Sequence, residues 1–240
     1  MTDEIRCPTI AELISTWESG LGRPGHERAL LLLGRAVAGA SEGELARWSL
    51  GRRDSALCRL RRMLFGEELN SVARCPHCRA ELELTFAISD IWREDNRPVE
   101  GSDVLEIGGF PVNFRVPDST DLEAARQMDT VEAARRRLLE RCILSDVPES
   151  GAEAIAAAIS ARERDADRRI GVTCQECGES WEEIFDISAW LWHEISAFVR
   201  RIVREVHALA SAYGWREEEI LSMSATRRQL YLGILAQASI

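Results

Sequence analysis

Two cysteine pairs organise this chain: CPHC at residues 75–78 and CQEC at residues 174–177. A C-x-x-C turn presents two thiolates on one side of a tight loop, and two such turns supply the four sulfur ligands of a tetrahedral Zn²⁺ site. A site filled by four cysteines has no open position for water, so it is structural. The motifs therefore predict structural zinc as the cofactor, with these metal ligands: Cys75, Cys78, Cys174 and Cys177.

The segment 79–173 separates the pairs, whereas the usual zinc motifs place them about 15–20 residues apart. An alternating apolar pattern follows each pair, at 82–86 and at 181–185, and predicts a half-buried strand. We expect these two strands to pair as one zinc ribbon. The alternative is that each pair is a local reduced dithiol or a redox couple, but neither pair has the strand-then-helix order of a thioredoxin-like motif.

The rest of the chain is mostly helical in pattern. Capping boxes at Thr9 and Ser41 begin helices, a Gly108-Gly109 pair predicts a hairpin turn, and apolar residues step by three and four along 189–213. The expected fold is α+β, predominantly α-helical, with a split four-cysteine zinc ribbon that carries a large insertion between its two knuckles.

This pattern divides the chain into four expected segments. They are an N-terminal helical region (1–70), the split zinc ribbon (71–90 and 171–187), an inserted β-hairpin with helices (91–170) and a C-terminal helical module (188–240).

Composition places the chain among ordinary globular proteins. It has 240 residues, of which 45% are hydrophobic and 29% charged. The net charge is −10, and all 30 basic residues are arginine. Because phosphate-backbone binding depends on clustered basic charge, this balance disfavours nucleic acid as a partner.

The sequence also bears on localisation. No apolar stretch approaches the roughly 18 residues of a membrane span, and the acidic N-terminus lacks the apolar region of a secretory signal. We therefore expect a cytoplasmic protein without a membrane partner.

No catalytic motif is present. The sequence contains no phosphate-binding loop, no H-E-x-x-H and no G-x-S-x-G. The isolated Cys7, Cys58 and Cys142 have no neighbouring histidine or acid that would activate a nucleophile, so we expect them to act as small hydrophobic residues. The sequence thus predicts no catalytic residues, and the chain is not expected to be an enzyme.

Several motifs resemble a known family. In the C-terminal part they are the Trp190-Leu191-Trp192 helix, residues 204–210, Tyr213-Gly214-Trp215, residues 219–222 and residues 227–232. Residues 21–24, 27–30 and 51–54 and both cysteine pairs fit the same pattern. Together they resemble bacterial proteins encoded with phage-tail-like contractile injection systems, similar to the T4-type baseplate hub assembly proteins.

The resemblance implies a non-enzymatic assembly chaperone or minor structural component of the baseplate or hub. Its implied partners are baseplate, hub or tube proteins, bound through protein–protein contacts with zinc as a structural clamp. The segment after Gly214 is the expected partner-binding element, although its aromatic residues could instead pack against the long helix. The candidate contacts are Trp215, Arg227, Arg228 and Tyr231.

A different function remains open at this point. Zinc ribbons also occur in nucleic-acid-binding and transcription-associated modules, where arginine clusters would contact phosphates. The net charge of −10 argues against this alternative.

Overall fold

A computed structural model describes residues 4–92, 101–148, 151–163 and 168–238. By its internal contacts the chain divides into two compact units. The first comprises Met1–Cys7 and Arg23–Trp190, and the second comprises Pro8–Gly22 and Leu191–Ile240. The four-segment division expected from the sequence stays a prediction.

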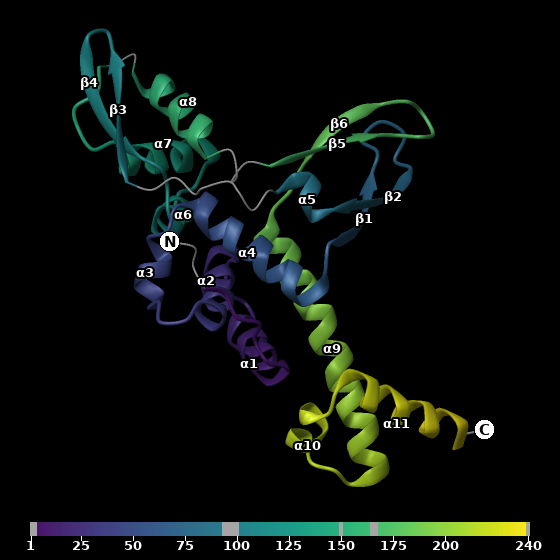
Figure 1. Cartoon of the computed structure of the whole chain (residues 1–240). Helices are drawn as coiled ribbons and strands as arrows, with labels where there is room; N and C mark the ends of the chain where they lie inside the picture. The colour runs from purple at the N-terminus through teal and green to yellow at the C-terminus, as the bar shows by residue number, and fades with distance from the viewer. Residues whose placement is uncertain (1–3, 93–100, 149–150, 164–167, 239–240) are drawn as a thin grey trace. The chain divides into compact units, whose positions relative to one another are not determined.

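The described structure mixes helices with small sheets and is mostly helical, as expected (Figure 1). The helices of the first unit are α2 (Gly25–Ala36), α3 (Glu42–Ala46), α4 (Leu50–Phe65), α5 (Ile88–Ile91), α6 (Ser119–Arg126), α7 (Val131–Cys142) and α8 (Ala152–Arg162). Its strands are β1 (Glu68–Arg74), β2 (Glu81–Ala87), β3 (Ser102–Ile107), β4 (Phe110–Arg115), β5 (Arg169–Thr173) and β6 (Ser180–Ile184).

The strands form three separate antiparallel hairpins, β1–β2, β3–β4 and β5–β6. The expected pairing of the strands that follow the two cysteine pairs is therefore wrong. Those strands are β2 and β6, and each pairs with the strand before its own cysteine pair. An adjacent strand separated by a short turn closes a much smaller loop than a strand on the far side of a long insertion.

The predicted glycine turn is confirmed in the hairpin β3–β4. Gly108 and Gly109 have φ values of 60° and 84°, the left-handed conformation that a tight hairpin turn requires. This hairpin packs against α7 and α8, and its buried core consists of Val112, Phe114, Cys142, Ile155 and Ile159. Cys142 and Cys58 are buried as expected, whereas Cys7 is exposed.

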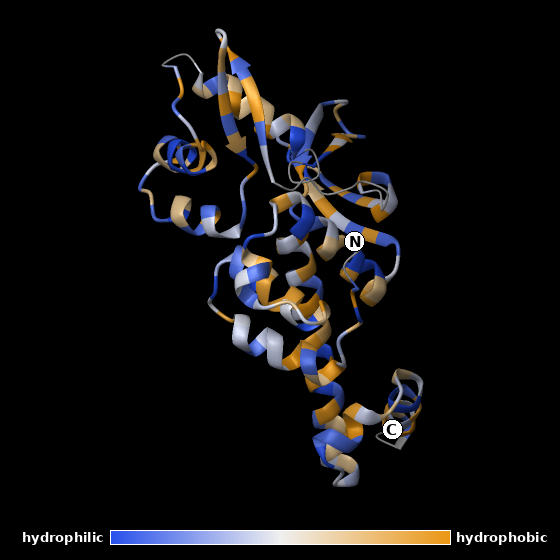
Figure 2. Ribbon diagram, turned by 60° about the vertical axis from the view of Figure 1, so that its left-hand side comes forward, coloured by the Kyte–Doolittle hydropathy of each residue, from blue (hydrophilic) through white to orange (hydrophobic). Residues whose placement is uncertain are grey.

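The second unit contains α1 (Ile10–Gly20), α10 (Glu217–Ser222), α11 (Ala225–Ala238) and most of α9 (Ile187–Tyr213). The capping box at Thr9 is confirmed, because Glu12 N–H donates to its hydroxyl while the Glu12 carboxylate accepts from Thr9 N–H. Figure 2 shows hydrophobic and hydrophilic residues alternating along α9, and the Trp17 indole on α1 donates to Ser196 on α9 at 3.1 Å. Helix α1 thus packs with helices far from it in the sequence.

Candidate metal centre

Each cysteine pair forms the turn of a hairpin. Residues 75–78 connect β1 to β2, and residues 174–177 connect β5 to β6. The sequence analysis missed β1 and β5, the strands before the pairs. In β1 the inward positions include Ser71 and Ala73, so the apolar alternation is weak there.

The two turns have matching backbone bonds. The N–H of the first cysteine donates to a carbonyl five residues later, from Cys75 to Ala80 at 2.9 Å and from Cys174 to Glu179 at 2.8 Å. The residue after each pair returns an N–H to the first cysteine at 3.0 Å, and its φ is positive: 65° at Arg79 and 76° at Gly178. The two motifs therefore fold as equivalent knuckles.

The four cysteines lie together. All four Sγ atoms are within 4.8 Å of one another. Sulfur atoms of different knuckles are 3.7 Å apart between Cys75 and Cys177 and 3.6 Å apart between Cys78 and Cys174. A disulfide would bring them to about 2.05 Å, whereas a tetrahedron with about 2.3 Å zinc–sulfur bonds has edges of about 3.8 Å. The four thiols are free, and their spacing fits a tetrahedral metal ion.

The cluster is partly open to solvent. Cys75 and Cys174 are each 1% exposed, whereas Cys78 and Cys177 are exposed. Each knuckle thus contributes one buried and one accessible sulfur, so a metal ion could enter from solvent.

The thiol pKa values differ between positions of the cluster. Burial disfavours a Cys75 thiolate, but N–H groups of Cys78 and His77 and hydrogen bonds from neighbouring thiols lower its pKa to about 6. At Cys177 the N–H of Glu179 favours the thiolate, but desolvation and the other sulfurs raise the pKa to about 12. The cluster therefore favours a thiolate at Cys75 and disfavours one at Cys78 and at Cys177. A bound divalent cation would stabilise the thiolate form of each ligand.

A second group of possible metal ligands consists of His26, Glu27 and Glu123. His26 Nε2 is 3.0 Å from a Glu123 oxygen, so the group contains an ion pair when the histidine is protonated. Arg23 pairs with Glu27 and Arg126 pairs with Glu123, and these cations compete with a metal for both carboxylates. The sequence analysis did not select these residues.

The proposed partner contacts lie in the second unit. Trp215 stacks on Tyr213 with ring centroids 4.5 Å apart and meets Tyr231 edge-on at 4.8 Å. Trp215 and Tyr231 are both half-buried, which favours packing against neighbouring helices over contact with a partner protein. Arg227 is exposed and lies over the Tyr231 ring at 5.8 Å.

Arg228, the fourth candidate partner contact, is buried in the second unit, which argues against its contact with a partner. Its side chain is 2% exposed, donates to Glu205 on α9 at 3.1 Å and donates to the Met223 carbonyl at 2.6 Å. A buried arginine paired in this way joins α11 to α9 and the end of α10. The sequence carries no signal for this pairing, because Glu205 is 23 residues away and resembles its charged neighbours on α9.

Comparisons of this chain with family models, with curated proteins and with solved structures found no match. Among the described residues, no helix is both long and apolar enough to cross a membrane.

Proposed function

We propose that the four cysteines bind one Zn²⁺ ion as a structural clamp in a non-enzymatic assembly factor or minor component of a contractile-tail baseplate or hub. The observation that carries the metal proposal is the convergence of four sulfur atoms from hairpins that lie far apart in the chain. Four thiolates suit zinc in both softness and geometry, and they leave no coordination position for a substrate. The ion would stabilise structure and would not activate water.

The clamp would act across the insertion. Joining the β1–β2 knuckle to the β5–β6 knuckle fixes both ends of the segment that carries β3, β4 and α6–α8. Structural zinc contributes on the order of 10 kcal/mol to the folding of small zinc domains, enough to hold two hairpins that share no backbone ladder. In this proposal the two knuckle hairpins are the split zinc ribbon.

The assembly role is supported by the resemblance of the sequence motifs and by an exposed apolar surface. Leu230 and Ile234 lie one turn apart on α11 and are 65% and 54% exposed, with Arg227 nearby in sequence. Contiguous exposed apolar surface marks many protein–protein interfaces, and arginine is enriched there. We propose that α11 contacts baseplate, hub or tube proteins in the cytoplasm during tail assembly.

The experiment is an affinity pull-down of the tagged chain from its native host, with zinc quantified in the same eluate. The expected result is recovery of baseplate, hub or tube proteins together with about one zinc per chain. A variant with Leu230→Glu and Ile234→Glu should keep its zinc and lose these partners.

Two outcomes would contradict the proposal. Recovery of polymerase subunits or nucleic acid would favour a zinc-ribbon nucleic-acid module. A purified chain that contains no zinc, and takes up none when refolded with it, would remove the structural clamp.

A further inference from the structure

A groove of about 440 Å³ lies in the first unit, between the two knuckle hairpins. Residues 71–74 of β1 form one border, and residues 183–186 at the end of β6 form the other. Side chains alternate between the two faces of a strand, so four consecutive lining residues indicate that the edge of each strand borders the groove. Figure 1 shows β1–β2 and β5–β6 as separate sheets, so these two edges do not pair with each other.

The edge of β1 that borders the groove has unpaired backbone groups. Cys75 N–H donates to the Ala80 carbonyl, and antiparallel bonding alternates along a strand, so the odd-numbered residues of β1 bond to β2. The N–H and carbonyl groups of Val72 and Arg74 therefore point away from β2. They have no other backbone partner among the described residues. An open edge of this kind can accept another extended strand.

Apolar side chains line the groove. Phe86, Phe185 and Trp190 form an aromatic cluster, with ring centroids 5.5, 6.0 and 6.3 Å apart. At the borders, Val72 is 64% exposed on β1 and Ile184 is 69% exposed on β6. The volume lies within the range of binding pockets, roughly 300–1,000 Å³. Apolar surface gathered in this way favours an occupant with aliphatic side chains.

The charge that lines the groove is negative. The one cation among its described lining residues is Arg74, which pairs with Glu81 at 2.6 Å, so its charge is balanced. Glu183 and Asp186 accept from neutral N–H donors, which leave the negative charge in place. Neither carboxylate has an ion pair within the part of the chain that the structure describes. A positively charged occupant would complement these two acids.

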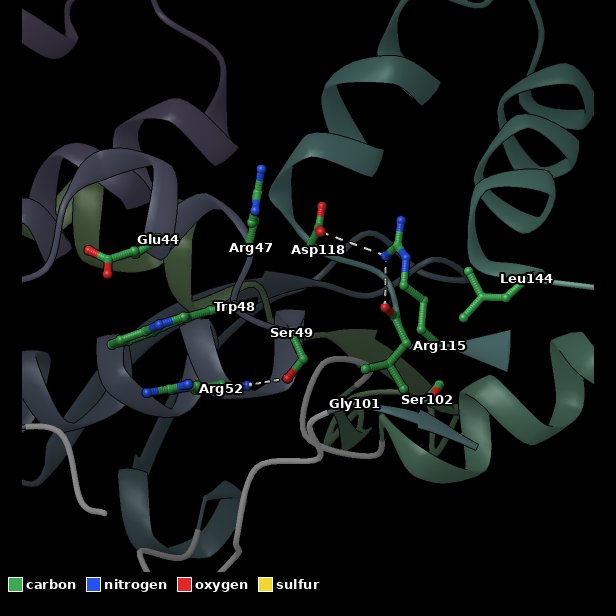
Figure 3. A pocket seen from close by; sticks show the side chains of 11 residues that line it. Glu44, Arg47, Trp48, Ser49, Arg52, Gly101, Ser102, Arg115, Asp118 and Leu144 are labelled. Carbon is green, nitrogen blue, oxygen red and sulfur yellow. Dashed lines mark hydrogen bonds and ion pairs between the residues drawn. The ribbon is translucent and has the colours of Figure 1, made fainter. Parts of the chain in front are cut away.

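A second pocket of the first unit, of about 520 Å³, differs in its charge. It opens between the turn from α3 to α4 and the junction of β4 with α6 (Figure 3). Arg115 pairs there with Asp118 at 3.6 Å and with Asp121 at 2.6 Å. Figure 3 shows Arg47 and Arg52 pointing apart. The groove between the knuckle hairpins is therefore the better candidate for a charged partner.

We propose that this groove binds an extended, basic segment of a partner protein, in which aliphatic residues alternate with arginine or lysine. The segment adds as a strand to the open edge of β1, and its aliphatic side chains pack on the aromatic cluster. Its basic side chains are attracted to Glu183 and Asp186 on the opposite border. The proposal rests on the zinc clamp only because the ion would hold both walls of the groove, and it does not depend on the baseplate role.

The test is a calorimetric titration of the full-length chain with a short acetylated and amidated peptide that alternates valine and arginine. Val72→Arg should weaken binding roughly tenfold or more, because it places a cation on the edge that the peptide approaches. Val104→Arg is the matched control, because it makes the same change at a 54% exposed position of β3, outside the groove. This control should bind like the unmodified chain. Glu183→Gln removes one exposed carboxylate and should weaken binding roughly threefold.

Modified peptides separate the charge of the segment from its backbone pairing. Glutamine in place of arginine should weaken binding roughly tenfold, and added salt should weaken binding of the arginine peptide. A strand bonds to its neighbour through every second N–H. N-methylation of the valine N–H groups in one peptide and of the arginine N–H groups in another should therefore have opposite effects, one removing binding and the other keeping it.

Zinc is quantified in the same samples, which separates this proposal from the metal clamp. Absence of peptide binding would overturn the groove proposal, whereas absence of zinc would contradict the clamp. Equal binding to Val72→Arg and Val104→Arg, equal binding of the arginine and glutamine peptides, or equal effects of the two methylation patterns would each overturn the groove proposal. If Val72→Arg fails to fold, Glu183→Gln and the peptide comparisons still decide.

Discussion

Cys75 is 1% exposed and directly follows the last residue of β1, so its sulfur is shielded from solvent. Replacing Cys75 with serine removes one of the four zinc ligands, so only three thiolates remain to coordinate the ion. We expect the Cys75→Ser chain to contain less than about a tenth of the zinc of the unmodified chain and to melt at a lower temperature. Metal analysis after dialysis and a thermal melt measure both effects.

Cys7→Ser is the matched control for this change. Cys7 is exposed and lies outside the cluster, so this variant should retain its zinc and its melting temperature. Equal zinc content in Cys75→Ser and Cys7→Ser would show that the four cysteines do not form one metal site.

Asp121 illustrates how a buried charge ties elements together. Its carboxylate accepts from Arg115 on β4 and from Arg141 on α7 at 2.6 Å. Burial alone would raise its pKa, but the hydrogen bonds from Arg115, from Asp118 N–H and from Arg141 lower it below the ordinary value. A carboxyl with a lowered folded-state pKa stabilises the protein above its unfolded pKa, about 3.9, and loses that contribution as the pH falls further.

We therefore predict that Asp121→Asn destabilises the first unit by about 3 kcal/mol at neutral pH, because two arginines lose their charged partner. The difference in unfolding free energy between the variant and the unmodified chain should shrink below about pH 4. Urea unfolding of both chains at several pH values measures this difference in unfolding free energy. A difference that is constant from pH 7 to pH 3 would contradict the ion-pair explanation.

At the scale of elements, the two knuckle hairpins offer an internal comparison. Arg79 and Gly178 occupy the same position after their cysteine pairs, and both have positive φ. An alanine Cβ at Gly178 would meet nothing within 4 Å, so only the backbone conformation would oppose it. Gly178→Ala should therefore cost about 1 kcal/mol.

Arg79→Gly is the reciprocal change. Relief of the left-handed conformation stabilises the folded chain, whereas glycine adds entropy to the unfolded chain. These effects nearly cancel, so we expect the free energy of unfolding to change by less than about 0.5 kcal/mol. Urea unfolding of the zinc-loaded variants compares the two. If Gly178→Ala were neutral, the two knuckles would not share the strained position.

How much of these elements is predictable from sequence depends on whether the signal is local. The capping box at Thr9 and the glycine turn at 108–109 need only neighbouring residues, and both are confirmed. The pairing of β1 with β2 was missed because the inward side of β1 includes Ser71 and Ala73, which give little hydrophobic contrast. The cysteine cluster could be predicted across a long insertion because two C-x-x-C pairs indicate a metal site whatever residues pack around them.

Other contacts of the site and fold have no such signal. The ion pair between Arg228 and Glu205 and the contact of Trp17 with Ser196 join residues whose types occur throughout the chain. Only the folded arrangement selects these particular partners. For the same reason the grouping of α1 with the C-terminal helices could not be derived from composition or periodicity.

At the scale of the whole molecule, the two units should respond differently to loss of metal. All four cysteines of the cluster belong to the first unit, whereas the second unit is held by helix packing and by the Arg228–Glu205 pair. Removing zinc with a strong chelator should therefore loosen the knuckle hairpins and leave α10 and α11 folded. Chelation removes the free energy of metal binding. Only the unit that binds the metal loses this contribution to its stability.

Limited trypsin digestion read by mass spectrometry tests this difference, because every basic residue is an arginine and both units contain cleavage sites. With chelator, cleavage should increase severalfold at Arg74, Arg79 and Arg169 in the hairpins, while Arg216 and Arg227 in the second unit keep their rates. Restoring zinc should reverse the change, which separates metal loss from irreversible damage. Equal acceleration in both units would mean that they unfold as one cooperative body, and unchanged cleavage in the hairpins would mean that the cluster does not depend on a metal.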